Sequence, residues 1–225
     1  MRMKEFYEGY WQKDAAPPQS DPTSAQRMVR LEAVLGPMVA ASRGVPRVVL
    51  DAGCGDGAFL VFLRRLGLRV SGLELAEAAA TRARQRCPDA DVRVGSLEDP
   101  PLPFDDASFD AIWCTEVLEH LFHVHDALSE LNRLLKPGAL LLLTTPYHGL
   151  AKNLLIAGLS FDGHYNPDLS HIRFFSRRTL DRSLRRAGFE PVRWEGVGRV
   201  WPLWKSMFVV ARKTGAPGPP PEVIG

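Results

Sequence analysis

The residues best suited to bind a charged small molecule stand in Val48–Gly57, which reads V-V-L-D-A-G-C-G-D-G. Its apolar, β-branched start predicts a buried strand that ends at Asp51. Glycines follow at alternate positions, Gly53, Gly55 and Gly57, and predict a tight turn into a helix. Because glycine lacks a Cβ atom, backbone N–H groups in this turn could approach a ligand closely. The loop suits a zwitterion, whose amino group would meet the aspartate and whose carboxylate would meet the N–H groups.

A second acid, Glu74, ends the next predicted strand, Arg69–Leu73. At the tip of a neighbouring parallel strand, a carboxylate can accept hydrogen bonds from both hydroxyls of a ribose. Enzymes that bind NAD use the same geometry, but their fingerprint is G-x-G-x-x-G, and a P-loop needs G-K-[ST] after its glycines. Neither pattern is present here. The loop and Glu74 together favour a cofactor that contains an amino acid and a ribose.

Two carboxylates and two imidazoles form a third group. Glu116, Glu119 and His120 stand at i, i+3 and i+4, which predicts one helical face. His171 comes from the separate S-H-I-R-F-F-S segment. Such a set could hold Mg²⁺, Mn²⁺ or Zn²⁺, or it could simply begin a helix that contacts the cofactor. We favour the second interpretation and predict no metal ligand.

The elements that must position these groups alternate between strand and helix from Arg47 onward, which predicts a parallel sheet covered on both faces. In such sheets, ligands bind at the carboxyl ends of the central strands. The predicted strands are Arg47–Asp51, Arg69–Leu73, Asp91–Val94, Ala111–Cys114, Ala139–Thr145, Pro191–Glu195 and Met207–Ala211.

The D-x-G-x-G-x-G loop and the block L-P-F-D-D-A-S-F-D (Leu102–Asp110) resemble motifs of the class I S-adenosylmethionine-dependent methyltransferases. The resemblance spans about residues 47–212. It implies an α/β, Rossmann-like fold with a seven-stranded, mostly parallel sheet of order 3-2-1-4-5-7-6, an antiparallel seventh strand and helices on both faces. It also implies S-adenosyl-L-methionine as cofactor, S-adenosyl-L-homocysteine as product, and in-line methyl transfer.

The same resemblance implies cofactor contacts. The glycine loop would wrap the methionine part, and Ser96 occupies the place of an aspartate that contacts the adenine amino group in relatives, so Glu98 or Asp99 could replace that contact. The aromatic start of the chain is similar to a lid segment of small-molecule methyltransferases. The predicted cofactor-binding residues are Asp51, Gly53, Cys54, Gly55, Gly57, Glu74, Leu75, Ser96, Leu97, Thr115, Glu116, His120, Tyr10 and Trp11.

The acceptor side is expected in the irregular stretch His148–Phe175, where relatives insert a substrate cover. We predict His171 as the catalytic base, because an imidazole titrates near neutral pH. The predicted substrate contacts are Tyr147, His164, Tyr165 and Phe174.

Composition places limits on the setting. The chain has 225 residues, 45% of them hydrophobic, and a net charge of +2, which argues against a strongly basic nucleic-acid surface. Its three scattered cysteines fit neither a disulfide framework nor a C-x-x-C metal site. With no signal peptide, and with Ala139–Leu143 as the longest apolar run, we expect a cytoplasmic protein without a membrane partner.

We expect a helical lid segment over residues 1–44, a methyltransferase domain over 45–213 and a disordered Pro/Gly tail over 214–225. The predicted activity is methyl transfer to a small-molecule acceptor, with a hydroxyl favoured. The E-x-x-E-H stretch resembles that of ubiquinone-pathway O-methyltransferases and that of metal-binding small-RNA 2′-O-methyltransferases. An RNA ribose 2′-O-methyltransferase is therefore one alternative, and a non-catalytic S-adenosylmethionine-binding sensor or partner subunit is another.

Overall fold

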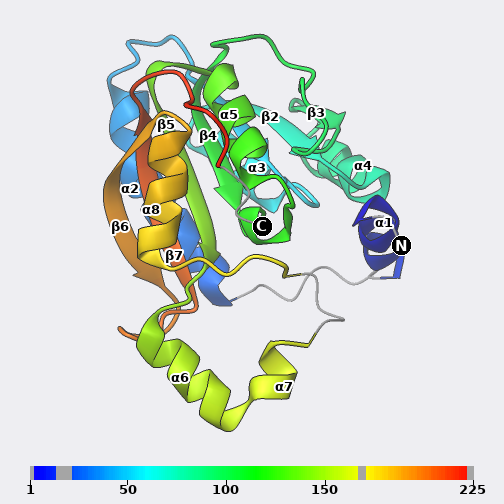
Figure 1. The fold of residues 1–225 in the computed structure, drawn as a ribbon. Helices are drawn as coiled ribbons and strands as arrows, with labels where there is room; N and C mark the ends of the chain where they lie inside the picture. The colour runs from blue at the N-terminus through cyan, green and yellow to red at the C-terminus, as the bar shows by residue number, and fades with distance from the viewer. Residues whose placement is uncertain (1–2, 14–21, 167–170, 222–225) are drawn as a thin grey trace.

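The fold is built on one seven-stranded sheet of order β3-β2-β1-β4-β5-β7-β6 (Figure 1). The computed structural model describes residues 3–13, 22–166 and 171–221. Strands β1 to β5 pair in parallel, and β7 runs antiparallel between β5 and β6. The predicted strand order and the antiparallel seventh strand are therefore confirmed.

The strands agree with their predicted positions except at the start of the fifth. There the strand begins at Leu135 rather than at the predicted Ala139, because Phe109 of β4 pairs with Leu135 before a register shift. The strands are β1 Val48–Ala52, β2 Arg69–Glu74, β3 Asp91–Val94, β4 Phe109–Thr115, β5 Leu135–Pro146, β6 Phe189–Val197 and β7 Ser206–Lys213. The helices are α1 Met3–Lys13, α2 Pro22–Ala40, α3 Ala58–Arg65, α4 Glu77–Arg86, the short 3₁₀ helix η1 Leu118–His120, α5 Val124–Leu134, α6 Leu150–Leu159, α7 Phe161–His164 and α8 Arg177–Arg186.

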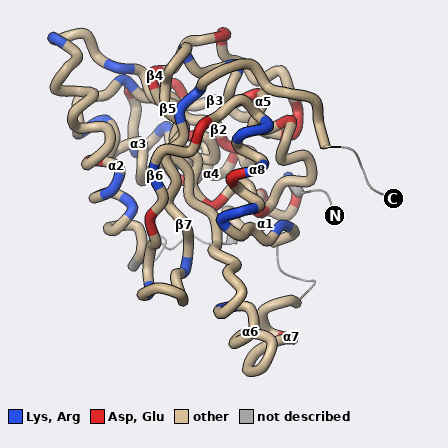
Figure 2. The backbone as a smooth tube through the Cα atoms, turned by 60° about the vertical axis from the view of Figure 1, so that its left-hand side comes forward, with Lys and Arg blue, Asp and Glu red and all other residues tan. Residues whose placement is uncertain are grey.

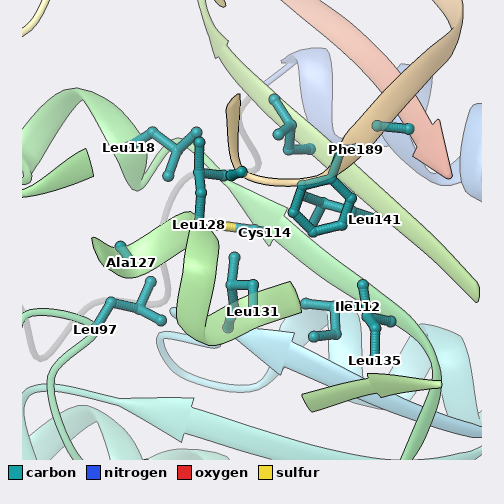
Figure 3. Packing of buried hydrophobic residues seen from close by; sticks show 14 of the residues in the cluster. Leu97, Ile112, Cys114, Leu118, Ala127, Leu128, Leu131, Leu135, Leu141 and Phe189 are labelled. Atoms are coloured by element: carbon teal, nitrogen blue, oxygen red, sulfur yellow. The ribbon is translucent and has the colours of Figure 1, made fainter. Parts of the chain in front are cut away.

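Two hydrophobic layers flank the sheet. On one face, α5 and α8 bury Leu128, Leu131 and Leu184 in a cluster that includes Ile112 of β4 (Figure 3). On the other face, α2, α3 and α4 cover a cluster that includes Trp113. Ile112 and Trp113 are neighbours in the chain, and successive strand side chains point to opposite faces. The central strand is therefore apolar on both sides, as expected for a parallel strand buried between helices.

The segment expected to form one lid divides into two parts. Helix α2 buries Leu31 and Leu35 completely, one turn apart, in the core beneath the sheet. Its Arg30 guanidinium also donates a 2.7 Å hydrogen bond to the carbonyl of Gly196 in β6. Helix α2 is thus part of the body of the domain, and only α1 lies over the site described below.

The Pro/Gly-rich tail is attached to the body over its first residues, contrary to the expected disorder. The amide of Thr214 donates to the carbonyl of Gly188, and the amide of Gly218 donates to that of Arg186. The Asn132 side chain also donates a 3.0 Å hydrogen bond to the carbonyl of Gly215. The two backbone bonds use carbonyls at or just after the end of α8, where the helix leaves carbonyls unpaired. Residues 222–225 lie outside the described part of the chain.

None of the described helices is long and apolar enough to cross a bilayer.

Candidate cofactor site

A cavity of about 550 Å³ opens at the carboxyl ends of β1, β2 and β4. Its volume is in the range typical of small-molecule sites. The lining comes from the glycine loop, the ends of β2 and β4, the loop after β3, the segment before η1, and helix α1. The lining residues are Lys4, Tyr7, Trp11, Gly53, Gly55, Leu73, Glu74, Leu75, Gly95, Ser96, Leu97, Glu98, Asp99, Thr115, Glu116, Val117, His120 and Leu121.

The amides of the glycine loop are already used within the protein. Those of Gly53 and Cys54 donate to the carbonyl of Leu73 at 2.8 and 3.0 Å. The amide of Gly55 donates to a carboxylate oxygen of Glu74 at 2.9 Å. The predicted role of these amides as donors to a cofactor carboxylate is therefore wrong in this structure, because hydrogen bonding between β1 and β2 continues past the strand ends. Gly53 and Gly55 instead give the cavity a floor without side chains.

Gly57 has a packing role and does not line the cavity. A Cβ atom here would lie 2.9 Å from the backbone Cα of Ala83, and φ is +84°. Only glycine lets α3 begin so close to α4. Cys54 is likewise buried away from the cavity, and burial raises the pKa of its thiol far above the usual range.

Asp51 is fully buried below the loop, and neither of its carboxylate oxygens has a hydrogen-bond partner among the described residues. Burial raises its pKa well above the ordinary value of 3.8, and the neighbouring Glu74 raises it further. An unpaired buried carboxylate is costly, and a bound cation would relieve that cost. This orphaned acid therefore fits a cofactor with an ammonium or sulfonium group, although Asp51 itself does not reach the cavity wall.

Glu74 does reach the cavity and is held by the backbone. Its two carboxylate oxygens accept hydrogen bonds from the amides of Gly55 and Ala76, at 2.9 and 3.0 Å. Burial raises its pKa, and these backbone bonds oppose the rise. A carboxylate oxygen has two lone-pair positions, so each can still accept a bond from a ribose hydroxyl.

The end of the cavity predicted for adenine is built by Gly95–Asp99. The Ser96 hydroxyl accepts a 3.0 Å bond from the amide of Glu98. The Glu98 carboxylate in turn accepts bonds from the amides of Phe122 and His123. Both side chains are occupied in building the loop. Asp99, exposed and lining the cavity, is the better candidate for a contact with the adenine amino group.

Helix α1 covers the cavity with Tyr7 and Trp11. A Cβ atom added to Gly55 would lie 3.3 Å from the Trp11 ring, so the indole lies directly over the glycine loop. The Tyr7 ring contacts the edge of His120, with ring centroids 5.8 Å apart. Tyr10, which we predicted as a cofactor contact, is 50% exposed and does not line the cavity. The predicted contacts from this helix therefore included Tyr10, which lies outside the lining, and missed Tyr7.

Two polar contacts hold α1 in place. The Glu8 carboxylate accepts hydrogen bonds from the amides of Glu77 and Ala78, at 2.7 and 3.3 Å, and so caps the start of α4. The Arg82 guanidinium donates a 2.6 Å bond to the carbonyl of Trp11. A carboxylate of α1 and a guanidinium of α4 therefore fix the lid helix over the loop.

The expected helical face of Glu116, Glu119 and His120 does not form. Glu116 has φ of +51°, outside helical geometry, and the following 3₁₀ helix has only three residues. The side chains therefore diverge. Glu116 lines the cavity and pairs with the buried Arg27 of α2 at 3.2 Å. Glu119 is fully buried and accepts a 3.0 Å bond from the Thr145 hydroxyl. Burial, with the nearby Glu116 charge, raises the pKa of Glu119 to about 8.

The two imidazoles of the third group, His120 and His171, do meet. The ring centroids of His120, on the cavity wall, and the exposed His171 are 4.9 Å apart. The amides of Ile172 and Arg173 donate to the carbonyl of Glu119 and hold the His171 segment there. Loss of hydration around its ring lowers the pKa of His171. Possible ligand atoms of Glu119, His120 and His171 all lie within 4.8 Å of one another. Among the residues that the structure describes, this cluster is the one that could hold a divalent ion.

The predicted substrate contacts lie outside the cavity lining. Phe174, His164 and Tyr165 form one aromatic cluster with His148, in which the rings of His148 and Phe174 are 4.8 Å apart. Tyr147 instead packs on Trp204. His148, which the sequence did not single out, is buried, and burial lowers its pKa to about 4.

The family model described as a methyltransferase domain matches residues 26–193. The chain belongs to this methyltransferase family. The match covers the glycine loop, Glu74, the cavity end of β4 and the His171 segment. The match confirms the prediction from the motifs that this chain is a class I, S-adenosylmethionine-dependent methyltransferase.

Curated relatives carry related names. The methyltransferase is 37% identical over 150 residues to a probable S-adenosylmethionine-dependent methyltransferase of Mycolicibacterium smegmatis, covering 67% of this chain and 54% of that protein. It is 38% identical over 130 residues to the malonyl-[acyl-carrier protein] O-methyltransferase of Yersinia pestis, covering 56% and 48%. A ubiquinone biosynthesis O-methyltransferase of Xanthomonas oryzae pv. oryzae is 37% identical over 137 residues, with 59% and 54% covered. The chain thus spans about half the length of these relatives.

Similarity to solved structures, at 18% and 20% sequence identity, supports the fold and does not identify the acceptor. The magnesium protoporphyrin IX methyltransferase of Synechocystis, solved with S-adenosylhomocysteine, superposes with a TM-score of 0.69 at 18% identity, covering 94% of this chain and 98% of that one. The Burkholderia thailandensis 1,6-didemethyltoxoflavin-N1-methyltransferase has a TM-score of 0.69 at 20% identity, with 94% and 87% covered.

Proposed function

We propose that this methyltransferase transfers a methyl group from S-adenosylmethionine to a hydroxyl oxygen of a small-molecule acceptor. The cofactor, when bound, supplies a methyl group on a positively charged sulfur. In the proposed site, Glu74 accepts the ribose hydroxyls, Asp51 places a negative charge below the loop, and Trp11 covers it. The remaining tasks of the chain are to align the acceptor and to remove its proton.

The pair His120–His171 is the observation that supports a hydroxyl acceptor. A hydroxyl must lose its proton during methylation, whereas a carboxylate acceptor is already ionised at neutral pH. His171 lies against the cavity wall at His120, where a neutral imidazole nitrogen can accept that proton. We assign His171 as the base. The Glu119 carbonyl, which holds the backbone after His171, positions it.

Names of relatives add support of a coarser kind. Two groups among them are O-methyltransferases, one acting on malonyl-[acyl-carrier protein] and one in ubiquinone biosynthesis. They favour oxygen as the accepting atom, and their different acceptors leave the substrate open.

A metal-assisted reaction is a second candidate, because Glu119, His120 and His171 bring three possible ligand atoms within 4.8 Å. In that arrangement, an ion would lower the pKa of a bound hydroxyl, and an RNA ribose hydroxyl would be a suitable acceptor. A non-catalytic sensor is the third candidate, and it would bind the cofactor without turnover.

The test measures methyl transfer from labelled S-adenosylmethionine to a panel of phenols, catechols and sugars, with and without a chelator. With an active hydroxyl acceptor, His171→Ala should lower kcat by about 100-fold or more. The dissociation constant of S-adenosylhomocysteine should stay unchanged, and the exposed His123→Ala should behave like the wild type.

Unchanged turnover in His171→Ala would remove the residue from the mechanism. Loss of activity with chelator, restored by one divalent ion, would establish the metal-assisted alternative. Tight binding of S-adenosylhomocysteine with no turnover on any acceptor would favour the sensor.

A further inference from the structure

Helix α6 exposes its apolar side chains and buries a charged one, the reverse of a normal surface helix. Its Leu150, Leu154 and Leu159 are 78%, 65% and 78% exposed, whereas Lys152 is only 9% exposed. The rest of its outward surface is Ala151, Leu155, Ala157 and Gly158, all exposed. A surface helix of a globular protein usually buries its apolar stripe and exposes its charges.

The inward face of α6 explains why the helix holds this orientation. The Lys152 ammonium donates hydrogen bonds to the carbonyls of Tyr147 and Trp204, at 2.8 and 3.1 Å. The Asn153 side chain bonds to the His148 ring at 3.2 Å. These contacts fix α6 by its polar residues, so rotating the leucines inward would carry the Lys152 ammonium away and leave the carbonyls of Tyr147 and Trp204 without this donor. The outward apolar face is therefore a stable feature of the fold.

The apolar surface continues onto the loop between β6 and β7. Val200 and Trp201 of this loop are 78% and 71% exposed. The loop is joined to α6 through the bond from Lys152 to the Trp204 carbonyl. Helix α6 and the loop stand together at one end of the molecule, away from the helices that cover the sheet (Figure 1). We call Leu150, Leu154, Leu159, Val200 and Trp201 the α6 patch.

Charge near the α6 patch is sparse and mostly positive. Helix α6 contains no acid, and the loop beside it carries the exposed cations Arg199 and Lys205. In Figure 2, the tube over α6 and α7 is almost free of acidic and basic colour, unlike the body above it. Leucine and tryptophan beside cations form the composition that binds anionic lipid interfaces.

We propose that the α6 patch docks on the surface of an anionic lipid bilayer. Helix α6 has 10 residues, about 15 Å in length, which is far too short to span a bilayer and suits a helix lying in the interface. The expectation of no membrane partner rested on the lengths of apolar runs, which concern only spanning segments. A second copy of the chain is a poorer occupant, because a symmetric contact would join two positively charged patches, and α6 offers no acid to pair with them.

The proposal goes beyond methyl transfer and does not depend on it. Docking needs neither cofactor nor acceptor, so its test is independent of the test of the proposed function. The hydrogen bond between Asn153 and the His148 ring joins α6 to the aromatic cluster of the acceptor segment. Docking would therefore bring this cluster close to the lipid surface.

The experiment is co-sedimentation of the full chain with vesicles of phosphatidylcholine alone and of phosphatidylcholine mixed with phosphatidylglycerol. We expect the protein to bind the mixed vesicles. The triple variant Leu150→Gln, Leu154→Gln, Leu159→Gln should lower its partition coefficient more than about tenfold. Arg199→Gln with Lys205→Gln should lower it by roughly fivefold per cation removed. Thermal unfolding of each variant checks that the fold is intact.

The matched control is Val45→Gln. Val45 is 71% exposed, but it precedes β1 and therefore lies at the amino ends of the parallel strands, whereas α6 follows the carboxyl end of β5. It should bind vesicles like the wild type. Wild-type protein that stays in the supernatant with both lipids would overturn the proposal, as would undiminished binding of the folded triple variant. A lipid-independent dimer that the triple variant abolishes would also overturn it and identify a second copy as the occupant.

Discussion

The amide of Gly55 donates a 2.9 Å hydrogen bond to the carboxylate of Glu74. The glycine loop and the acid at the end of β2 are therefore one structural unit, and neither can move without the other. Asp51 lies buried beside this unit with both oxygens unpaired. Ionising this carboxyl costs free energy in the free protein, and a positively charged ligand would offset that cost.

Asp51→Asn should therefore raise stability and weaken cofactor binding at the same time. The pKa of Asp51 is raised above 3.8 in the folded state, so its contribution to stability becomes increasingly unfavourable as pH rises above that value. The melting temperature of the variant should exceed that of the wild type at pH 7 and approach it in acid. Affinity for S-adenosylmethionine should fall by about tenfold or more.

Asp110→Asn is the contrasting control. Burial would raise the pKa of Asp110, but a hydrogen bond from the Val48 amide and pairing with Lys136 and Arg47 lower it overall. Its loss should lower the melting temperature and leave cofactor affinity unchanged. If Asp51→Asn also destabilised the free protein and bound the cofactor normally, the acid would be structural.

Gly57→Ala should act on stability through helix packing. The new methyl group would meet the backbone of Ala83, and the left-handed φ of +84° would be strained as well. Gly44→Ala is a close control, because its φ is +85° and no atom lies within 4 Å of the added Cβ. Backbone strain alone should cost about 1 kcal/mol in either variant. The excess loss in Gly57→Ala, measured by urea unfolding, reports the clash and should be at least a further 1 kcal/mol or so. Equal losses in both variants would show that α4 can shift to accommodate the added methyl group at little cost in stability.

Trp11→Ala should weaken binding of S-adenosylhomocysteine, because the indole covers the glycine loop and lines the cavity. We expect a loss of about tenfold by calorimetric titration, equivalent to about 1.4 kcal/mol. Tyr10→Ala removes an aromatic ring from the same helix but from its exposed side, and should change affinity by less than about twofold. A larger effect at Tyr10 would mean that α1 rotates when the cofactor binds.

Stability should fall in mild acid because of His148. Burial lowers its pKa from 6.5 to about 4, so the unfolded chain binds a proton in this interval that the folded protein does not. The free energy of unfolding therefore decreases as pH falls from 6.5 to 4, by at most about 3 kcal/mol. His148→Gln should flatten the pH dependence measured by urea unfolding. The exposed His123→Gln should retain the wild-type slope, and an unchanged slope in His148→Gln would assign the acid sensitivity elsewhere.

Local pattern was enough to predict the sheet and most of the cavity wall. Strand order followed from the family motifs, and Glu74, Ser96 and Thr115 line the cavity as predicted. Each of these residues lies at or just after the carboxyl end of a strand. That edge is where an open α/β sheet binds ligands, so the chain position of such residues already implies their place in the fold.

The failures concern directions that depend on neighbours distant in the chain. The loop amides turn toward Leu73 and Glu74 because β1 and β2 pair beyond their ends. Glu116 and Glu119 diverge because the backbone at Glu116 takes φ of +51°. No spacing rule within a single segment predicts such turns.

The sequence by itself determined the fold family, the strand that carries Asp51 and the loop that bounds the cofactor cavity, because alternating apolar runs and glycine positions depend on local chemistry. Tertiary structure decided what each polar group does. It buried Asp51 without a partner, brought His171 to His120, and turned Lys152 inward so that the leucines of α6 face outward. The physical reason is that hydrogen bonding and burial are settled by contacts between segments far apart in the chain, which residue types and spacing do not encode locally.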